Sequence, residues 1–303
     1  MIQADHLCKN FEAFPALSNV SCSVPRGSVY GMVGSNGAGK STFLRLIAGV
    51  YKPDSGSITL DGTPIFENPN LKSKIVFVPD EPYFLPGATI ERMTALYQAV
   101  YPNFDKHYLS ELLFALKLSQ TQPISTFSKG MKRQAVTALA LSCRADYLLF
   151  DETFDGMDPI MRSYAKNLIC EDILARKATA IITSHSLREL EDTCDQLALL
   201  HRGGLILESD VQNLKTSQFK IQIAFAEPYD ETKFSEFNPL HYVQYGSVAS
   251  FLVHGEQTEI LHRLQALSPI LLEILPLSLE EIFTYEMEAL GYAFSTEEGG
   301  FSL

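Results

Sequence analysis

A glycine-rich segment near the N-terminus contains the residue types that can hold a polyphosphate. Residues 34–41 read G-S-N-G-A-G-K-S and match the pattern G-x-x-x-x-G-K-[ST]. Its glycines allow positive φ angles, which let backbone N–H groups turn inward around an anion. Lys40 would then bridge the β- and γ-phosphates, and the Ser41 hydroxyl would ligate Mg²⁺. The residues expected to contact the nucleotide are Gly34, Ser35, Asn36, Gly37, Ala38, Gly39, Lys40, Ser41 and Thr42.

The surroundings of this segment predict the strand–loop–helix order that a phosphate site needs. The apolar run 29–33 precedes the loop, and residues 40–49 have the spacing of a helix. A helix that begins at the loop adds partial positive charge where the phosphates would lie. A glycine-rich turn without a ligand is the alternative, and the flanking elements favour the phosphate site.

Two acids end a second apolar run further along the chain. Residues 147–152 read Y-L-L-F-D-E. Carboxylates at the carboxyl end of a parallel strand face the crevice where open α/β sheets bind ligands. Asp151 suits the Mg²⁺ shell, and Glu152 could polarise the attacking water. Solvated acids at the end of a core strand are the alternative, and the phosphate loop favours the catalytic interpretation.

A third motif indicates a family by resemblance. Residues 127–134 read F-S-K-G-M-K-R-Q and resemble the signature of ABC ATPases, usually written L-S-G-G-Q. The serine of this motif lies 23 residues before Asp151. Ser128 and the N–H groups near Gly130 stand where a helix begins, so they would form another anion site. A plain helix N-cap by Ser128 is the alternative.

Two smaller motifs fall where the ABC family places them. F-D-G-M-D-P at 154–159 resembles the D-loop, with Asp158 as its acid. T-S-H-S at 183–186 places His185 like the family's switch histidine, 33 residues after Glu152. A structural histidine is the alternative, which the spacing from Glu152 disfavours.

The resemblance also assigns a residue that contacts adenine, and the chain departs from the family pattern at one position. Phe11 matches the aromatic residue that stacks on adenine in this family, with Phe14 as its rival. In V-P-D-E-P at 78–82, Asp80 stands where the family has a glutamine. An ionised aspartate accepts hydrogen bonds but cannot donate them. We therefore expect Asp80 to approach Mg²⁺ and to couple to a partner, but not to donate to the attacking water.

The resemblance implies an ATP-binding and ATP-hydrolysing subunit of an ABC transporter. The signature, the P-D-E-P loop and L-E-E-I-F at 279–283 are similar to the ABC-2 branch, which exports drugs, antibiotics or lipids. The expected partners are a separate transmembrane permease subunit and a second ATPase subunit, as a homodimer or heterodimer, on the cytoplasmic face of the membrane. Each ATP would lie between one subunit's phosphate loop and the other's signature. Catalysis would rest on Lys40, Glu152 and His185, with Ser41, Asp151 and Asp80 around the metal.

Two other functions compete with this interpretation. The first is a non-transport ABC protein that acts in DNA repair or on the ribosome. One ATPase cassette, no sustained heptad repeat and a net charge of −12 disfavour it, because nucleic-acid binding needs clustered Lys and Arg. The second is a catalytically inactive regulatory subunit, which the presence of Glu152 and His185 disfavours.

The pattern of elements predicts an α/β core followed by an accessory domain. Alternating strands and helices over 1–210 favour a P-loop ATPase core with a mostly parallel sheet, antiparallel N-terminal strands and an inserted helical subdomain at about 81–145. Residues 211–303 predict a small α+β domain that ends in an amphipathic helix at 278–290. That tail has 13 acids against 4 Lys and Arg.

Cysteines and apolar runs limit the remaining possibilities. The 5 cysteines are scattered and form no C-x-x-C pair, so free thiols in a reducing compartment are expected. No run reaches the roughly 18 apolar residues that cross a bilayer. A membrane function would therefore need a second chain.

Overall fold

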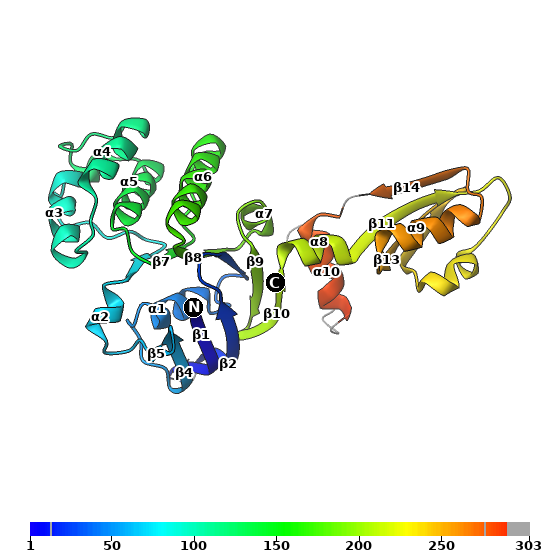
Figure 1. Cartoon of the computed structure of the whole chain (residues 1–303), viewed down its shortest axis with the longest axis horizontal. Helices are drawn as coiled ribbons and strands as arrows, with labels where there is room; N and C mark the ends of the chain where they lie inside the picture. Colours follow the sequence, from blue (N-terminus) through cyan, green and yellow to red (C-terminus); the bar gives the residue numbers. More distant parts are fainter. Residues whose placement is uncertain (13, 276, 290–303) are drawn as a thin grey trace. The chain divides into compact units, whose positions relative to one another are not determined.

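The computed structural model describes residues 1–12, 14–275 and 277–289 (Figure 1). The chain divides into two compact units. The first unit runs from Met1 to Glu208, and the second begins at Ser209. No helix among the described residues is long and apolar enough to cross a membrane. All five cysteines are free.

A six-stranded sheet forms the centre of the first unit. Its strand order is β10-β9-β3-β8-β7-β6. The pairs β3–β8, β3–β9, β7–β8 and β6–β7 are parallel, which confirms the prediction of a mostly parallel sheet. Strands covered on both faces are apolar throughout, and all of β3 is buried. The strands are β3 (Val29–Val33), β6 (Ile75–Val78), β7 (Tyr147–Asp151), β8 (Thr179–Ser184), β9 (Gln196–His201) and β10 (Gly204–Asp210).

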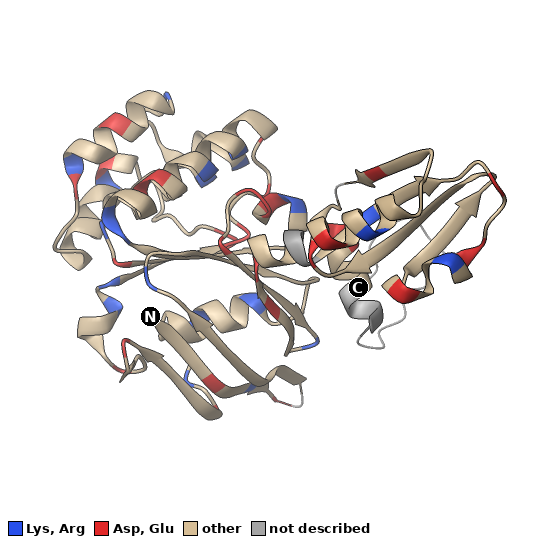
Figure 2. Ribbon diagram, turned by 45° about the vertical axis from the view of Figure 1, so that its right-hand side comes forward, with Lys and Arg blue, Asp and Glu red and all other residues tan. Residues whose placement is uncertain are grey.

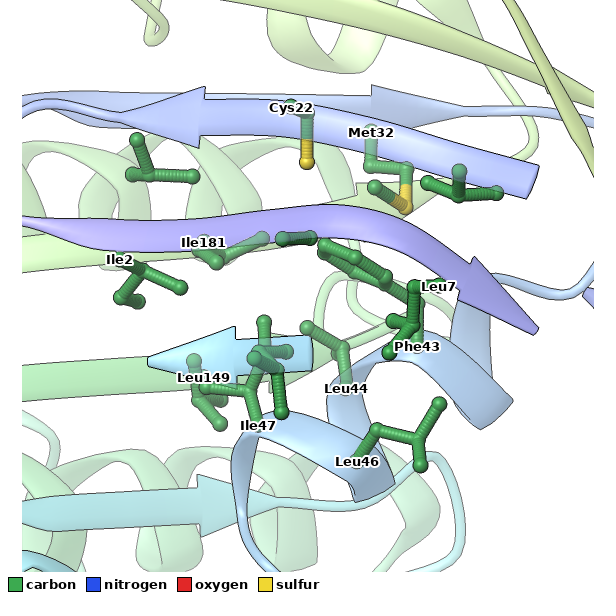
Figure 3. Packing of buried hydrophobic residues seen from close by; sticks show 14 of the residues in the cluster. Ile2, Leu7, Cys22, Met32, Phe43, Leu44, Leu46, Ile47, Leu149 and Ile181 are labelled. Atoms are coloured by element: carbon green, nitrogen blue, oxygen red, sulfur yellow. The ribbon is translucent and has the colours of Figure 1, made fainter. Parts of the chain in front are cut away.

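A smaller antiparallel sheet packs with the first helix. Its order is β2-β1-β4-β5, and β1 pairs antiparallel with both β2 and β4. Figure 3 shows Phe43, Leu44 and Ile47 of helix α1 beside Ile2 and Leu7 of β1, in one buried cluster. This packing fixes α1, and therefore the loop before it, against the sheets. The elements are β1 (Ile2–Phe11), β2 (Phe14–Val24), β4 (Ser55–Leu60), β5 (Thr63–Pro64) and α1 (Lys40–Ile47).

Residues 89–118, whose apolar residues have helical spacing, form two helices within the segment expected to be a helical subdomain. Thr89 caps α3 by accepting a hydrogen bond from Arg92 N, and Asp105 caps α4 through Tyr108 N. Pro102 lies between them, where its missing N–H cannot continue a helix. Figure 1 shows α3, α4 and α5 grouped together. The helices of this unit are α2 (Pro69–Lys72), α3 (Ile90–Val100), α4 (Lys106–Ala115), η1 (Ile124–Thr126), α5 (Lys129–Ser142), α6 (Pro159–Arg176) and α7 (Leu187–Leu190).

The second unit contains a four-stranded antiparallel sheet. The strands lie in the order β12-β13-β11-β14 across the sheet. Along the chain, the 3₁₀ helix η2 follows β11 and the helix α9 precedes β14, which gives a βαββαβ topology. One face carries a buried cluster that includes Phe234 and Phe251. The elements are α8 (Val211–Ser217), β11 (Gln218–Ala224), η2 (Glu231–Phe237), β12 (Leu240–Tyr245), β13 (Val248–His254), α9 (Gln257–Ala266), β14 (Leu271–Leu275) and α10 (Leu279–Ala289).

The closing helix predicted at 278–290 corresponds to α10. Leu279, Ile282 and Phe283 are buried, as the amphipathic pattern predicts. Leu290 lies outside the described residues, as do the side chains from 286 to 289. Figure 2 shows that Lys and Arg residues are interspersed with Asp and Glu residues over the ribbon.

Candidate nucleotide and catalytic site

The loop between β3 and α1 approaches the neighbouring backbone at two glycines. A Cβ on Gly34 would stand 2.3 Å from the carbonyl oxygen of Leu200. A Cβ on Gly39 would stand 2.5 Å from the carbonyl oxygen of Ala16, and Gly39 has a φ of 107°. Only glycine fits both positions without strain. Gly39 also provides no side-chain cap for α1, so the first N–H groups of this helix stay available to an anion.

Lys40 lies at the centre of the site. Its side chain is 5% exposed, and its Nζ donates to the carbonyl oxygens of Gly34 at 2.5 Å and Ser35 at 3.1 Å. The same ammonium is 3.1 Å from Glu152 Oε1. The loop therefore holds one fixed positive charge beside Glu152, the acid that directly follows β7.

Asp151 and Ser41 form a pair that suits a hard cation. The Ser41 hydroxyl donates to Asp151 Oδ1 at 3.1 Å, and the Thr183 hydroxyl donates to the same oxygen at 2.8 Å. Asp151 Oδ2 is buried and has no hydrogen-bond partner in the described part of the chain. Burial raises the pKa of Asp151, although both hydroxyls act in the opposite direction. A buried carboxylate oxygen without a donor, next to a hydroxyl, fits the oxygen ligands that Mg²⁺ prefers.

Glu152 and His185 are brought together at the ends of the neighbouring strands β7 and β8. His185 Nδ1 lies 3.1 Å from Glu152 Oε2, and the Glu152 side chain is only 13% exposed. Glu152 has a φ of 46°, a left-handed conformation that non-glycine residues seldom adopt outside turns and functional sites. Its N–H donates to the hydroxyl of Thr183. The Thr183 hydroxyl is therefore hydrogen-bonded to both acidic residues, to the side chain of Asp151 and to the backbone of Glu152.

Sequence reasoning missed Thr183. In the sheet register Thr183 pairs with Asp151 across β7 and β8. Its position at the end of a predicted strand, two residues before His185, was the available signal. The pairing of β7 with β8 is a tertiary fact, so the contact itself could not be predicted from a local pattern.

A cavity of about 240 Å³ joins most of the predicted contacts. Phe11 and Phe14 both line it, so the choice between the two aromatic residues stays open. Phe11 packs edge-on against Tyr51, whereas Phe14 is 61% exposed. The lining consists of Phe11, Phe14, Ala16, Ser35, Asn36, Gly37, Ala38, Gly39, Lys40, Ser41, Thr42, Asp80 and Glu152.

Asp80 reaches the rim of this cavity but has a partner that sequence reasoning missed. Arg133 Nη2 donates to Asp80 Oδ1 at 2.5 Å. The Arg133 side chain is 2% exposed, and that of Asp80 is 51% exposed. The predicted approach of Asp80 to a metal stays a prediction.

Ser128, Gly130 and Asp158 do not line this cavity. The Ser128 hydroxyl caps α5 by accepting from Met131 N, and Asp158 caps α6. A Cβ on Gly130 would stand 3.4 Å from the carbonyl oxygen of Gly156, so the start of α5 lies beside the D-loop segment. Within one chain these three residues therefore lie outside the lining of the nucleotide cavity.

Comparisons with known proteins agree with this geometry. The family model described as ABC transporter matches residues 17–155. The ABC transporter ATP-binding protein YtrB of Bacillus subtilis is 31% identical over 283 residues, which cover 93% of this chain and 97% of YtrB. The chain belongs to the ATP-binding proteins of ABC transporters. It is an ATPase that binds ATP and Mg²⁺, and this membership favours transport over a non-transport role.

Other relatives of this ABC ATPase extend the likeness. The SkfA peptide export ATP-binding protein SkfE of Bacillus subtilis is 28% identical over 227 residues, which cover 73% of this chain and 92% of SkfE. A solved structure of an ATP-binding subunit of an ABC transporter has a TM-score of 0.64 and 25% identity, over 71% of this chain and 92% of its own. The fold of the ABC ATPase is thereby confirmed.

Proposed function

We propose that this ABC ATPase hydrolyses ATP in the cavity between the phosphate loop and Glu152, and that it powers export through a separate membrane permease subunit. One observation carries the site assignment: Lys40, Ser41 and Glu152 line a single cavity, and Ser41 donates to the buried Asp151, whose Oδ2 has no partner in the described chain. The peptide export named for SkfE supports the direction of transport.

Each residue has a distinct part in the proposed reaction. Lys40 binds and orients the β- and γ-phosphates by its fixed charge. The free N–H groups at the start of α1 donate hydrogen bonds to the phosphate oxygens. Ser41 and Asp151 would hold Mg²⁺, with Asp80 as a further candidate. The metal supplies charge neutralisation on the phosphates. Glu152 orients a water molecule and takes its proton at a carboxylate oxygen, while His185 Nδ1 fixes the position of that carboxylate.

The position of Ser128, Gly130 and Asp158 supports a dimer. These residues do not line the nucleotide cavity of their own chain, and we propose that they complete the cavity of a second ATPase subunit. That subunit is a second copy or a homologue. The proposed partners are therefore another ATPase subunit and a permease, with no nucleic acid, at the cytoplasmic face of the membrane.

The Glu152→Gln variant tests the proposed function. Because the amide cannot take the proton, turnover should fall by at least about a hundredfold while ATP binding persists. Size-exclusion chromatography with light scattering should then show a dimer that accumulates in ATP. The matched control is Lys40→Ala, which removes the fixed charge and should weaken ATP binding itself. Near-normal hydrolysis by Glu152→Gln would remove Glu152 from the mechanism.

A further inference from the structure

Arg133 of α5 is a buried cation beside the nucleotide cavity that the reaction above does not use. Its side chain is 2% exposed, and its Nε has no hydrogen-bond partner in the described part of the chain. Nη2 donates to Asp80 Oδ1 at 2.5 Å, and Nη1 lies 3.5 Å from the carbonyl oxygen of Pro79. A guanidinium removed from water in this way needs a counter-charge, and Asp80 is the carboxylate that it contacts.

Asp80 in turn needs a positive partner, because it lies at the nucleotide cavity. It lines a cavity whose other charged side chains are Lys40 and Glu152, and its side chain is half exposed. A free carboxylate at this rim would repel the phosphates of a nucleotide, because like charges in a partly desolvated site repel more strongly than in bulk water. An acid at this position is therefore compatible with nucleotide binding only if a cation compensates it.

We propose that Arg133 is a positioning residue of the nucleotide site, which holds the Asp80 carboxylate in an ion pair and cancels its charge toward the bound phosphates. Arg133 acts through Asp80 and does not itself line the cavity. The proposal rests on the nucleotide site proposed above. It also connects the cavity rim to α5, because Arg133 lies one helical turn after the residues that begin this helix.

A second carboxylate near Arg133 has its own partner. Lys129 Nζ contacts Asp155 Oδ2 at 2.6 Å, and this hydrogen bond is the main cause that lowers the pKa of Asp155; the charge of Arg133 contributes less. Removing Arg133 should consequently affect Asp80 far more than Asp155. The effect of such a variant on nucleotide binding should then depend on the charge of Asp80.

The test measures nucleotide affinity by calorimetric titration with ATP in excess EDTA, so that neither hydrolysis nor metal ligation contributes. Arg133→Met should weaken ATP binding by about five- to tenfold, because it leaves Asp80 uncompensated. The double variant Asp80→Asn/Arg133→Met should recover to within about twofold of the unaltered protein. Asp80→Asn alone should tighten the binding of metal-free ATP, because it removes a negative charge beside the phosphates while Arg133 remains. Raising the salt concentration should reduce the loss in Arg133→Met, since the repulsion is screened.

Two controls separate charge compensation from a purely structural effect. Arg144→Met removes another partly buried arginine of the same helical region, paired with Asp172 and Asp105, and should leave ATP affinity unchanged. Arg133→Lys keeps the charge and should bind ATP nearly as the unaltered protein does. If Arg133→Met does not fold, Arg133→Gln allows the same comparison with Asp80→Asn.

Two results would overturn the proposal. One is an unchanged affinity in Arg133→Met. The other is a double variant that binds ATP as weakly as Arg133→Met alone, which would assign Arg133 a packing role. Failure of the unaltered protein to bind ATP would instead reject the proposed nucleotide site, so the two failures are distinguishable.

Discussion

At the scale of single residues, Asp151 combines a functional advantage with a cost to the fold. Its carboxylate is fully buried, and only Oδ1 receives hydrogen bonds. Burial raises the pKa of this group above its ordinary value. The proton is therefore held more tightly in the folded state than in the unfolded state. Asp151 favours folding below its unfolded pKa, and that contribution is lost as the pH rises through the raised folded pKa.

We predict that Asp151→Asn stabilises the nucleotide-free protein while it abolishes most turnover. At pH 7.5 the melting temperature should rise by about 2–4 °C, because a buried charge without a counter-ion is removed. Mg²⁺-dependent hydrolysis should fall by about a hundredfold or more, since an amide is a weaker ligand for a hard cation.

Thermal melts across pH 5 to 8 provide the check on this prediction. The difference in melting temperature between the two proteins should shrink as the pH falls toward the range where Asp151 of the unaltered protein is protonated. A variant that melts below the unaltered protein at pH 7.5 would show that Asp151 is compensated within the fold.

Sequence reasoning at the residue scale succeeded where spacing carries the information. The loop around Lys40 followed from a local motif, and His185 was selected by its spacing from Glu152, which it contacts in the structure. Thr183 and Arg133 were not predicted as partners, because each makes its contact only after distant elements pack.

At the scale of elements, the beginning of α5 allows a direct comparison of a cap with a functional site. Ser128 caps α5 and Thr89 caps α3 by the same kind of hydrogen bond. Replacing either residue with alanine should lower the free energy of unfolding by about 1 kcal/mol. We predict that Ser128→Ala additionally reduces ATP turnover and ATP-dependent dimerisation.

Thr89→Ala is the matched control for this prediction, and its turnover should stay within about twofold. Denaturant titrations and steady-state ATPase rates on both variants are the measurements. Equal turnover in the two variants would leave Ser128 as an ordinary N-cap.

The elements that sequence reasoning missed lack a decisive periodicity. Strand β9 is a short apolar run whose length does not distinguish a strand from a helix. Strand β12 alternates only between exposed and intermediate positions, so its pattern indicates no buried face. The break at Pro102 divides what looked like one helical segment into α3 and α4. The strands and helices around the phosphate loop, in contrast, were predicted because caps, glycines and apolar runs coincide there.

At the scale of the whole molecule, the second unit carries none of the residues that line the nucleotide cavity. A chain that ends at Asp210 keeps β10, and with it every strand of the six-stranded sheet. We predict that this shortened chain binds ATP with an affinity within about twofold of the full chain. It should dimerise less well or respond less to its permease, because the second unit is proposed to be an accessory domain.

Calorimetry, sedimentation and permease-stimulated turnover on the shortened chain check the prediction. Lost ATP binding would show that the nucleotide site depends on residues beyond 210. Unaltered dimerisation together with unaltered stimulation would leave the second unit without the proposed accessory role.

The strand order of the central sheet determines when the cavity can first form during synthesis on the ribosome. Strand β3 is made early, but its two sheet neighbours, β8 and β9, lie within residues 179–201 and are made much later. At about 5–20 residues per second, the ribosome needs roughly 7–30 s to travel from Val33 to Thr179. During that interval Tyr30 and Met32 have neither neighbouring strand of the central sheet beside them. The nascent chain therefore carries a complete phosphate-loop sequence for many seconds before the central sheet can form around it.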